Sequence, residues 1–249
     1  MRAEEDLYVE TDYKILYEDE FFLVVDKPAP LPVHPVGRFK EKNLLSLLIR
    51  DVGSGSEGLR IVNRLDSETI GIVLVAKSAL AAGKLGILFE NRQVTKEYHA
   101  IVFGAPKAQE GTISESLGLD IQSGHNIRTS DPHGEKAQTD YQVLSNAGEY
   151  SLLKVMPRTG RTHQIRAHLS FLGHPIVGDK IYIDPRIFER YIHEGWLEEM
   201  RPIVKAERLL LHASRLQFRH PWTEELVKFT SAIPRCFDSF LNTEQQFII

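Results

Sequence analysis

The sequence is poor in several features that would define its class at once. It holds a single cysteine, Cys236, so an internal disulfide is impossible and a reducing compartment is favoured. No apolar run approaches the ~20 residues that a membrane-spanning helix needs. The acidic N-terminus lacks the apolar core of a secretory signal. We therefore expect a cytoplasmic protein that does not interact with membranes.

Metal-binding patterns are also absent from the sequence. The ten histidines are scattered, and no CxxC pair accompanies them. His163 and His168 are five residues apart, whereas a helical zinc pair needs a spacing of four. We expect no metal site.

The negative charge is concentrated at one end of the chain. The net charge is −4, but the first 20 residues alone carry −6, which leaves +2 for the remainder. Phosphates respond to the local surface within a Debye length of about 10 Å, not to the global charge. The overall acidity therefore does not exclude a nucleic-acid partner. Residues 1–13 are expected to form a solvated acidic tail, and residues 14–249 a single catalytic domain.

The hydrophobic pattern predicts strands and helices in irregular alternation. Strands are expected at residues 15–17, 21–25, 71–76, 97–103, 139–144, 150–156, 209–218 and 226–230. Helices are expected at residues 43–49, 79–90, 162–172 and 185–200, with hairpins and loops over 104–138 and a polar turn near the C-terminus. Strands that follow one another through hairpins, with a few helices between them, indicate an α+β domain with a largely antiparallel mixed sheet.

The stretch NRLDSETIG, residues 63–71, leads into the apolar run 71–76. Arg64 and Asp66 are therefore expected on a loop that a buried strand holds in place. A carboxylate with a guanidinium beside it suits nucleophilic or general-base chemistry. The alternative is that Asp66 caps its own turn and Arg64 is an ordinary ion-pair partner.

Further motifs occur in a fixed order with this stretch. VVDKPAPLPVHP precedes it, and KEYHAIV, RTGRTHQIRAHLSFLGHPIVGD and RLLLHASRLQFRHP follow it. Together the motifs resemble the signature set of the RluA-like pseudouridine synthases, over roughly residues 15–232. The resemblance implies that family's fold, flanking helices and loops around a central RNA-binding cleft.

The match has departures. The family pattern around the aspartate is His-Arg-Leu-Asp-x-x-Thr-Ser-Gly, whereas this chain has Asn63 and Ile70 in place of the histidine and the serine. Neither is the catalytic position, so the departures bear on substrate fit. We also expect the chain to start directly at the catalytic domain, without the small N-terminal RNA-binding domain of many relatives.

The resemblance implies a reaction and a set of catalytic residues. The enzyme cleaves the glycosidic bond of a uridine in RNA, turns the uracil and rejoins it through carbon 5, with no cofactor. Asp66 matches the essential carboxylate and Arg166 the arginine that ion-pairs with it. Tyr98 matches the tyrosine that stacks on the base and takes the proton from carbon 5, although a strand tyrosine in the core has the same pattern. Leu211 matches an apolar pocket residue, and a plain core leucine is the alternative.

Other residues are candidates for holding the RNA. Arg64 matches a wedge or phosphate-facing arginine that keeps the flipped nucleotide open. Arg158 and Arg161 lie in a segment, 157–166, that contains no acid, at a predicted helix N-terminus that favours phosphate. Arg158 could equally be an ordinary solvated arginine. His34 could line the RNA groove or pack within its loop.

Three functions are consistent with the sequence. The first is an RNA pseudouridine synthase that acts, as a monomer, on structured RNA, with transfer RNA slightly favoured over ribosomal RNA. The second is a catalytically silent RNA-binding or RNA-folding factor. The third is a retaining glycosidase, which would need a second acid about 5 Å from Asp66 that no motif supplies.

Overall fold

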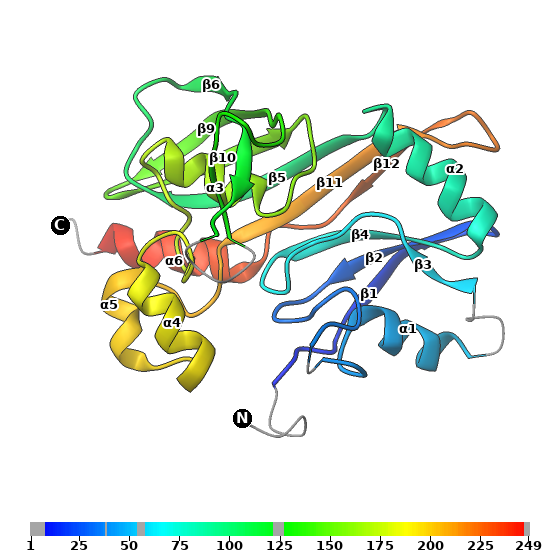
Figure 1. Ribbon diagram of the computed structural model, residues 1–249, viewed down its shortest axis with the longest axis horizontal. Coiled ribbons are helices and arrows are strands. Elements are labelled where there is room, and N and C mark those ends of the chain that lie inside the picture. The colour runs from blue at the N-terminus through cyan, green and yellow to red at the C-terminus, as the bar shows by residue number, and fades with distance from the viewer. Residues whose placement is uncertain (1–7, 38, 54–57, 122–126, 247–249) are drawn as a thin grey trace. The chain divides into compact units, whose positions relative to one another are not determined.

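A computed structural model describes residues 8–37, 39–53, 58–121 and 127–246 (Figure 1). Residues 1–7 of the expected acidic tail lie outside this part. The chain divides into two compact units. The first contains the residues up to Lys96 together with Ala213–Ala232, and the second contains Glu97–His212 and the chain from Ile233 onward.

The first unit is a small sheet with two helices. Its elements are β1 (Lys14–Glu18), β2 (Phe22–Lys27), α1 (Leu44–Val52), β3 (Arg60–Ile61), β4 (Ile70–Ala76), α2 (Ala79–Glu90), most of β11 (Leu211–Arg219) and β12 (Leu226–Thr230). The β1–β2, β2–β4, β3–β4 and β11–β12 pairs are all antiparallel.

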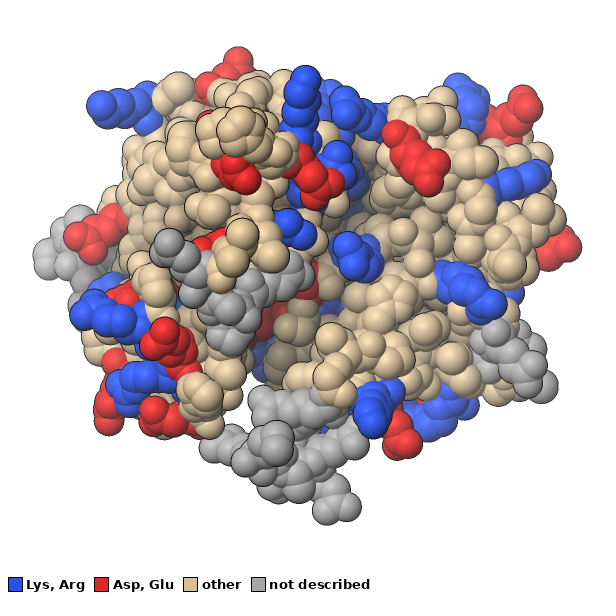
Figure 2. Space-filling model, in the orientation of Figure 1, with Lys and Arg blue, Asp and Glu red and all other residues tan. Residues whose placement is uncertain are grey.

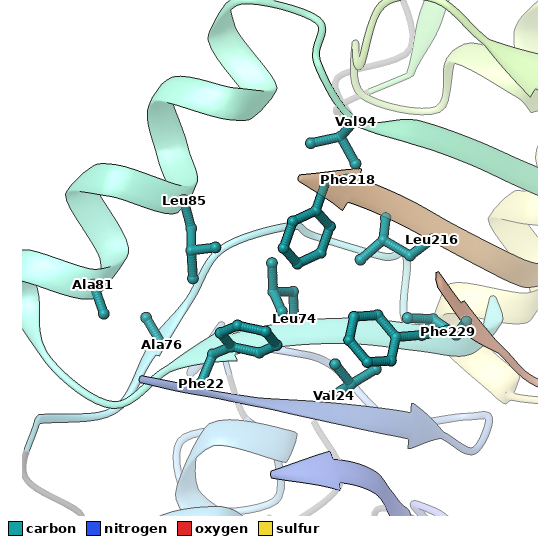
Figure 3. Close-up of a cluster of buried hydrophobic side chains, with 11 residues drawn as sticks. Phe22, Val24, Leu74, Ala76, Ala81, Leu85, Val94, Leu216, Phe218 and Phe229 are labelled. Atoms are coloured by element: carbon teal, nitrogen blue, oxygen red, sulfur yellow. The ribbon is translucent and has the colours of Figure 1, made fainter. Parts of the chain in front are cut away.

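The core of the first unit forms where α2 covers one face of β2 and β4. Alternate residues of the two strands, such as Phe22 and Leu74, are buried on this face, and they pack against Leu85 of α2 (Figure 3). Side chains on the opposite face of β2 and β4, such as Leu23 and Val75, are equally buried. A strand that is buried on both faces reads as a continuous apolar run, which is the pattern that residues 71–76 show.

The second unit combines antiparallel strands and helices with a separate short hairpin. Its strands are most of β5 (Thr95–Phe103), then β6 (Glu110–Ile113), β7 (Leu117–Leu119), β8 (Arg128–Ser130), β9 (Thr139–Ala147) and β10 (Tyr150–Pro157). Its helices are α3 (Gln164–Phe171), α4 (Pro185–Glu194), η3 (Glu198–Met200), α5 (Arg201–Val204) and α6 (Arg235–Gln246). The order β5-β10-β9-β6 is antiparallel throughout, and β7 and β8 pair separately.

The predicted α+β class with a largely antiparallel sheet is confirmed. The helix predicted at residues 79–90 is α2 with the same bounds, and Asn43 caps α1 through a bond from the Ser46 N–H to its Oδ1 at 3.0 Å. The central cleft stays a prediction.

Two local predictions were wrong. The single helix expected over residues 185–200 ends at Glu194, because Gly195 adopts a positive φ of 79° that terminates α4. The polar turn expected at the C-terminus is the end of α6. This helix buries Phe237, and Phe240 and Leu241 pack against the same cluster.

Candidate active site

Asp66 lies on the loop that precedes β4, as the sequence predicts, and is half-buried. We call residues 62–69 the Asp66 loop. Asn63 anchors its start to β4: its Oδ1 accepts the Leu74 N–H at 2.6 Å and its Nδ2 donates to the Ile72 carbonyl at 3.2 Å. The Thr69 N–H donates to the Asp66 carbonyl at 3.1 Å. The loop is therefore anchored to β4 at its start and closed by a hydrogen bond within it after Asp66.

Gly71 makes the strand after this loop possible. It adopts a φ of 113°, and a Cβ at this position would lie 2.3 Å from the carbonyl oxygen of Ala213 in β11. Any other residue would both strain the backbone and force β11 away from it. The close approach of β11 therefore requires glycine at this position of the motif.

Lys27 was missed by the sequence reasoning. It ends β2 and is fully buried, and its amino group donates to the Ser67 carbonyl in the Asp66 loop at 3.0 Å. A lysine at the end of an apolar strand, followed directly by a proline-rich loop, was the available signal. Its partners are backbone carbonyls, which leave no trace in the sequence.

Arg64 and His34 are brought near each other in the first unit. Arg64 is exposed on the Asp66 loop, and His34 is half-buried in the proline-rich loop. Burial lowers the pKa of His34, and the positive charge of Arg64 lowers it further. At neutral pH the imidazole is therefore mostly uncharged and can act as both donor and acceptor.

Arg166 is held by a buried ion pair that the sequence reasoning did not find. Its Nε and Nη2 atoms donate to Asp179 Oδ2 and Oδ1, each at 2.8 Å. Arg166 is 6% exposed and Asp179 is 0% exposed. The guanidinium also lies over the ring of Tyr182, 5.4 Å from its centroid. Asp179 belongs to the motif HPIVGD, so its presence there was the available signal.

The charged form of Asp179 is stabilised despite its burial. Burial raises its pKa, but the charge and hydrogen bonds of Arg166 and the N–H groups of Ile181 and Tyr182 lower it more, so that the net shift is downward. Arg166 is therefore fixed in both position and charge. Its pairing with Asp66 stays a prediction.

A buried polar chain fixes helix α3, which carries Arg166. His168 Nε2 lies 3.0 Å from the Glu115 carbonyl, which can only accept, and Nδ1 lies 2.9 Å from Thr139 Oγ1. Gln164 Nε2 donates to Thr139 Oγ1 at 2.9 Å, and Thr159 donates its hydroxyl to Gln164 Oε1 at 2.6 Å. With His168 neutral, the Thr139 hydroxyl can accept from Gln164 and donate to Nδ1, so that each member of the chain has a partner. Burial favours this neutral form by lowering the pKa of His168.

Tyr98 and Leu211 meet at one hydrophobic cluster of the second unit. Leu211 is buried in this cluster, and the half-buried Tyr98 packs against it. Tyr98 is paired in register with Val155 of β10. Both residues therefore have a packing role, and their predicted contacts with the target base stay predictions.

Arg158 and Arg161 have acidic partners from other segments. Arg158 Nε is 2.5 Å from Asp140 Oδ2, and Arg161 Nη1 is 2.7 Å from Glu135 Oε1. The absence of acids from residues 157–166 therefore does not make this segment an unneutralised positive patch. Both arginines keep exposed side chains, which phosphate could still reach.

Charges on the surface of α4, η3 and α5 are paired in the same way. Arg190 pairs with Glu194 and Glu199, and Arg201 pairs with Glu198. Figure 2 shows basic and acidic side chains intermingled over this region. Such a surface offers phosphate little net attraction.

The candidate residues fall into two groups. Asp66, Arg64 and His34 belong to the first unit, and Tyr98, Arg166, Leu211, Arg158 and Arg161 belong to the second. Within the described ranges, no three His, Cys, Asp or Glu side chains are grouped so that they could hold a metal ion. The helices in these ranges are all too short or too polar to cross a membrane.

The comparison with protein families defines the class. The family model described as RNA pseudouridylate synthase matches residues 21–171, and the chain belongs to this family. It is an RNA pseudouridine synthase, an enzyme that isomerises uridine in RNA to pseudouridine.

Named relatives match over most of the chain. An uncharacterized RNA pseudouridine synthase of Chlorobaculum parvum is 38% identical over 88% of this chain and 70% of its own length. Ribosomal large subunit pseudouridine synthase D of Vibrio cholerae is 35% identical over 88% of this chain and 67% of its own length.

Solved structures agree with these relatives. Human RNA pseudouridylate synthase domain containing 4 has a TM-score of 0.71 and 28% identity over 93% of this chain and 92% of its own. Human RNA pseudouridylate synthase domain containing 1 has a TM-score of 0.69 and 27% identity over 94% and 95%.

Proposed function

We propose that this enzyme converts uridine in ribosomal RNA to pseudouridine, with Asp66 as the carboxylate that acts on the sugar. The supporting observation is the Asp66 loop. It presents a half-buried carboxylate on a backbone that is tied to β4 through Asn63 and to the end of β2 through Lys27. A carboxylate suits this step because the sugar gains positive character as the glycosidic bond breaks.

Arg166 and Tyr98 complete the proposed chemistry. Arg166 keeps the carboxylate of Asp66 ionised, and its rigid attachment to Asp179 supports this role because a fixed guanidinium needs no reorganisation during the reaction. Tyr98 stacks on the target base and accepts the proton from carbon 5, with Leu211 beside it. The shared cluster of Tyr98 and Leu211 supports a common pocket.

The flipped nucleotide is held by the exposed arginines. Arg64 and the neighbouring His34 contact the RNA near Asp66, and Arg158 and Arg161 of the second unit contact phosphates of the same RNA. The exposure of the three arginine side chains supports this. We also propose that the enzyme works in the cytoplasm as a monomer, which light scattering of the purified protein tests.

The choice of ribosomal RNA rests on the relatives. Several relatives that match at 32–35% identity are named ribosomal large subunit pseudouridine synthase D. The slight preference for transfer RNA that the sequence suggested stays open, and the experiment below includes it.

The decisive experiment follows the release of tritium from uridine labelled at carbon 5. Wild-type protein is incubated separately with naked large-subunit ribosomal RNA and unmodified transfer RNA, and modified sites are then mapped. Asp66→Asn keeps the shape of the side chain but removes its charge, so turnover should disappear while folding and RNA affinity persist. Tritium release by the Asn variant would refute the role of Asp66, and modification of transfer RNA alone would refute the proposed substrate. Binding without any release by wild-type protein would favour the silent RNA-binding factor.

A further inference from the structure

Lys27 makes an unusual set of contacts for a lysine. It is 0% exposed. Its Nζ donates to the carbonyls of Pro28 and Leu31, both at 2.9 Å, and of Ser67 at 3.0 Å. An ammonium group has three N–H donors, and all three are used here. Lysine is seldom fully buried, so its position calls for a role beyond solubility.

The Ser67 carbonyl is the point at which Lys27 reaches the Asp66 loop. Ser67 directly follows Asp66, and its carbonyl also accepts the Leu31 N–H at 2.8 Å. Two donors, one from the last residue of β2 and one from the loop after it, thus hold the peptide group next to the carboxylate. Without the amino group, the carbonyls of Pro28 and Leu31 would lose a buried partner, which is costly.

The charge of Lys27 also acts on this loop. Burial lowers the pKa of Lys27 to about 7, while the carboxylates of Asp66, Glu68 and Asp26 raise it. Asp66 makes the largest of these opposing contributions. Donation to three carbonyls requires all three hydrogens of the protonated Lys27 amino group. The positive charge of this protonated form also attracts the Asp66 carboxylate.

We propose that Lys27 is a positioning residue for Asp66, which fixes the catalytic loop through the Ser67 carbonyl and supplies a buried positive charge beside the carboxylate. It does not contact RNA, because no part of it is exposed. This inference rests on the role of Asp66 proposed above. Misplacement of a reacting group by about 1 Å can cost ~100-fold in rate, which is the scale of effect expected here.

The test is Lys27→Met, which keeps a linear side chain but removes the three donors and the charge. The single-turnover rate on the RNA that wild-type protein modifies should fall by ~100-fold, with RNA affinity unchanged. Amide hydrogen exchange measured by NMR gives a second readout that does not depend on activity. The Leu31 and Thr69 amides, which bond to the loop carbonyls of Ser67 and Asp66, should exchange at least ~10-fold faster.

Leu85→Ala is the matched control. Leu85 is buried in the core of the same unit, on α2, so its truncation loosens that core without removing a bond to the Asp66 loop. It should change neither the rate nor the two amides to a comparable degree. An equal loss in this variant would show that Lys27→Met acts only through general destabilisation.

Two further outcomes would overturn the positioning role of Lys27. A wild-type rate in Lys27→Met, or unchanged exchange at Leu31 and Thr69, would overturn the proposal. If Asp66→Asn proves active, the proposed function fails separately, and the exchange data alone then decide whether Lys27 holds the loop. If Lys27→Met does not fold, Lys27→Gln replaces it. The Gln side chain retains two N–H donors, and we expect a smaller loss of about 10-fold.

Discussion

Tyr98 has an observed packing role and a proposed role in the chemistry. Its ring packs against the cluster that contains Leu211, and its neighbour Ala100 is buried in that cluster. A core tyrosine and a base-stacking tyrosine have the same sequence pattern, because β-strands favour tyrosine for either purpose. Only the hydroxyl group separates the two roles.

Tyr98→Phe removes that hydroxyl and keeps the ring. If the hydroxyl helps to remove the proton from carbon 5, turnover should fall by ~100-fold or more. RNA affinity and the thermal unfolding midpoint should stay near their wild-type values, because the stacking face and the packing remain. Tritium release at constant RNA saturation measures the effect, and a wild-type rate would leave Tyr98 with a packing and stacking role only.

Asn63 gives a structural reason for one departure from the family pattern. Its amide bonds to both a donor and an acceptor of the β4 backbone, at Leu74 and Ile72. The side chain thus extends the pairing of β4 beyond β3. The sequence correctly predicted a loop before a buried strand. It could not reveal these bonds, because every residue type except proline has the backbone N–H and C=O groups that Asn63 contacts.

At the scale of elements, local signals predicted some boundaries and missed others for physical reasons. Ser78 and Asn43 cap their helices through their own side chains, so the starts of α2 and α1 could be read directly. Helix α3 has no such cap. His163 before it adopts a positive φ of 53°, and the Arg161 N–H donates to Gln164 Oε1 instead. The predicted start at residue 162 was therefore two residues early.

The errors at 185–200 and at the C-terminus have different causes. The hydrophobic periodicity of the sequence continues past Gly195, because Trp196 and Met200 pack in the same cluster as Ile187. The helix itself nevertheless ends before Gly195. In α6, Phe237 and Phe240 lie three residues apart and pack on one cluster, which is a helical spacing that the sequence analysis did not use. The polar residues after them obscured this signal.

The buried ion pair between α3 and the following loop allows a stability prediction. Asp179→Asn leaves the Arg166 charge buried without its carboxylate, which should lower the free energy of unfolding by about 3–5 kcal/mol. Because the folded-state pKa of Asp179 is lowered, its contribution is present above the unfolded pKa near 3.9 and is lost as the pH falls below it. The difference between wild type and variant should therefore shrink at low pH.

Urea unfolding at pH 7 and at pH 3 measures this difference. Glu135→Gln is the control, because it breaks the exposed pair with Arg161 and should cost less than about 1 kcal/mol. Equal losses in the two variants would mean that burial adds nothing to the Arg166–Asp179 pair. A loss in Asp179→Asn that does not depend on pH would contradict its electrostatic origin.

At the scale of the whole molecule, the distribution of charge bears on how RNA is held. The chain is acidic overall, and its excess of negative charge lies in the first 20 residues. The sequence suggested a basic segment from Arg158 to Arg166, but the fold supplies Asp140, Glu135 and Asp179 as partners for its three arginines. These acids come from other parts of the chain, so a linear search for acids near residues 157–166 could not find them.

Arg158→Glu tests whether an arginine with such a partner still contributes to RNA binding. The side chain of Arg158 is 65% exposed, so phosphate can compete with Asp140 for its guanidinium. If it does, the variant should bind ribosomal and transfer RNA more weakly by similar factors, and the slope of log affinity against log salt should become shallower by about 1. The modified uridine should stay the same, because phosphate contacts carry no sequence information.

Arg186→Glu, on the neutralised α4 surface, is the matched control and should leave the slope unchanged. Filter binding between low and moderate salt measures the slopes. If the two variants behave alike, Asp140 has already neutralised Arg158, and the exposed Arg64 near Asp66 becomes the next residue to test.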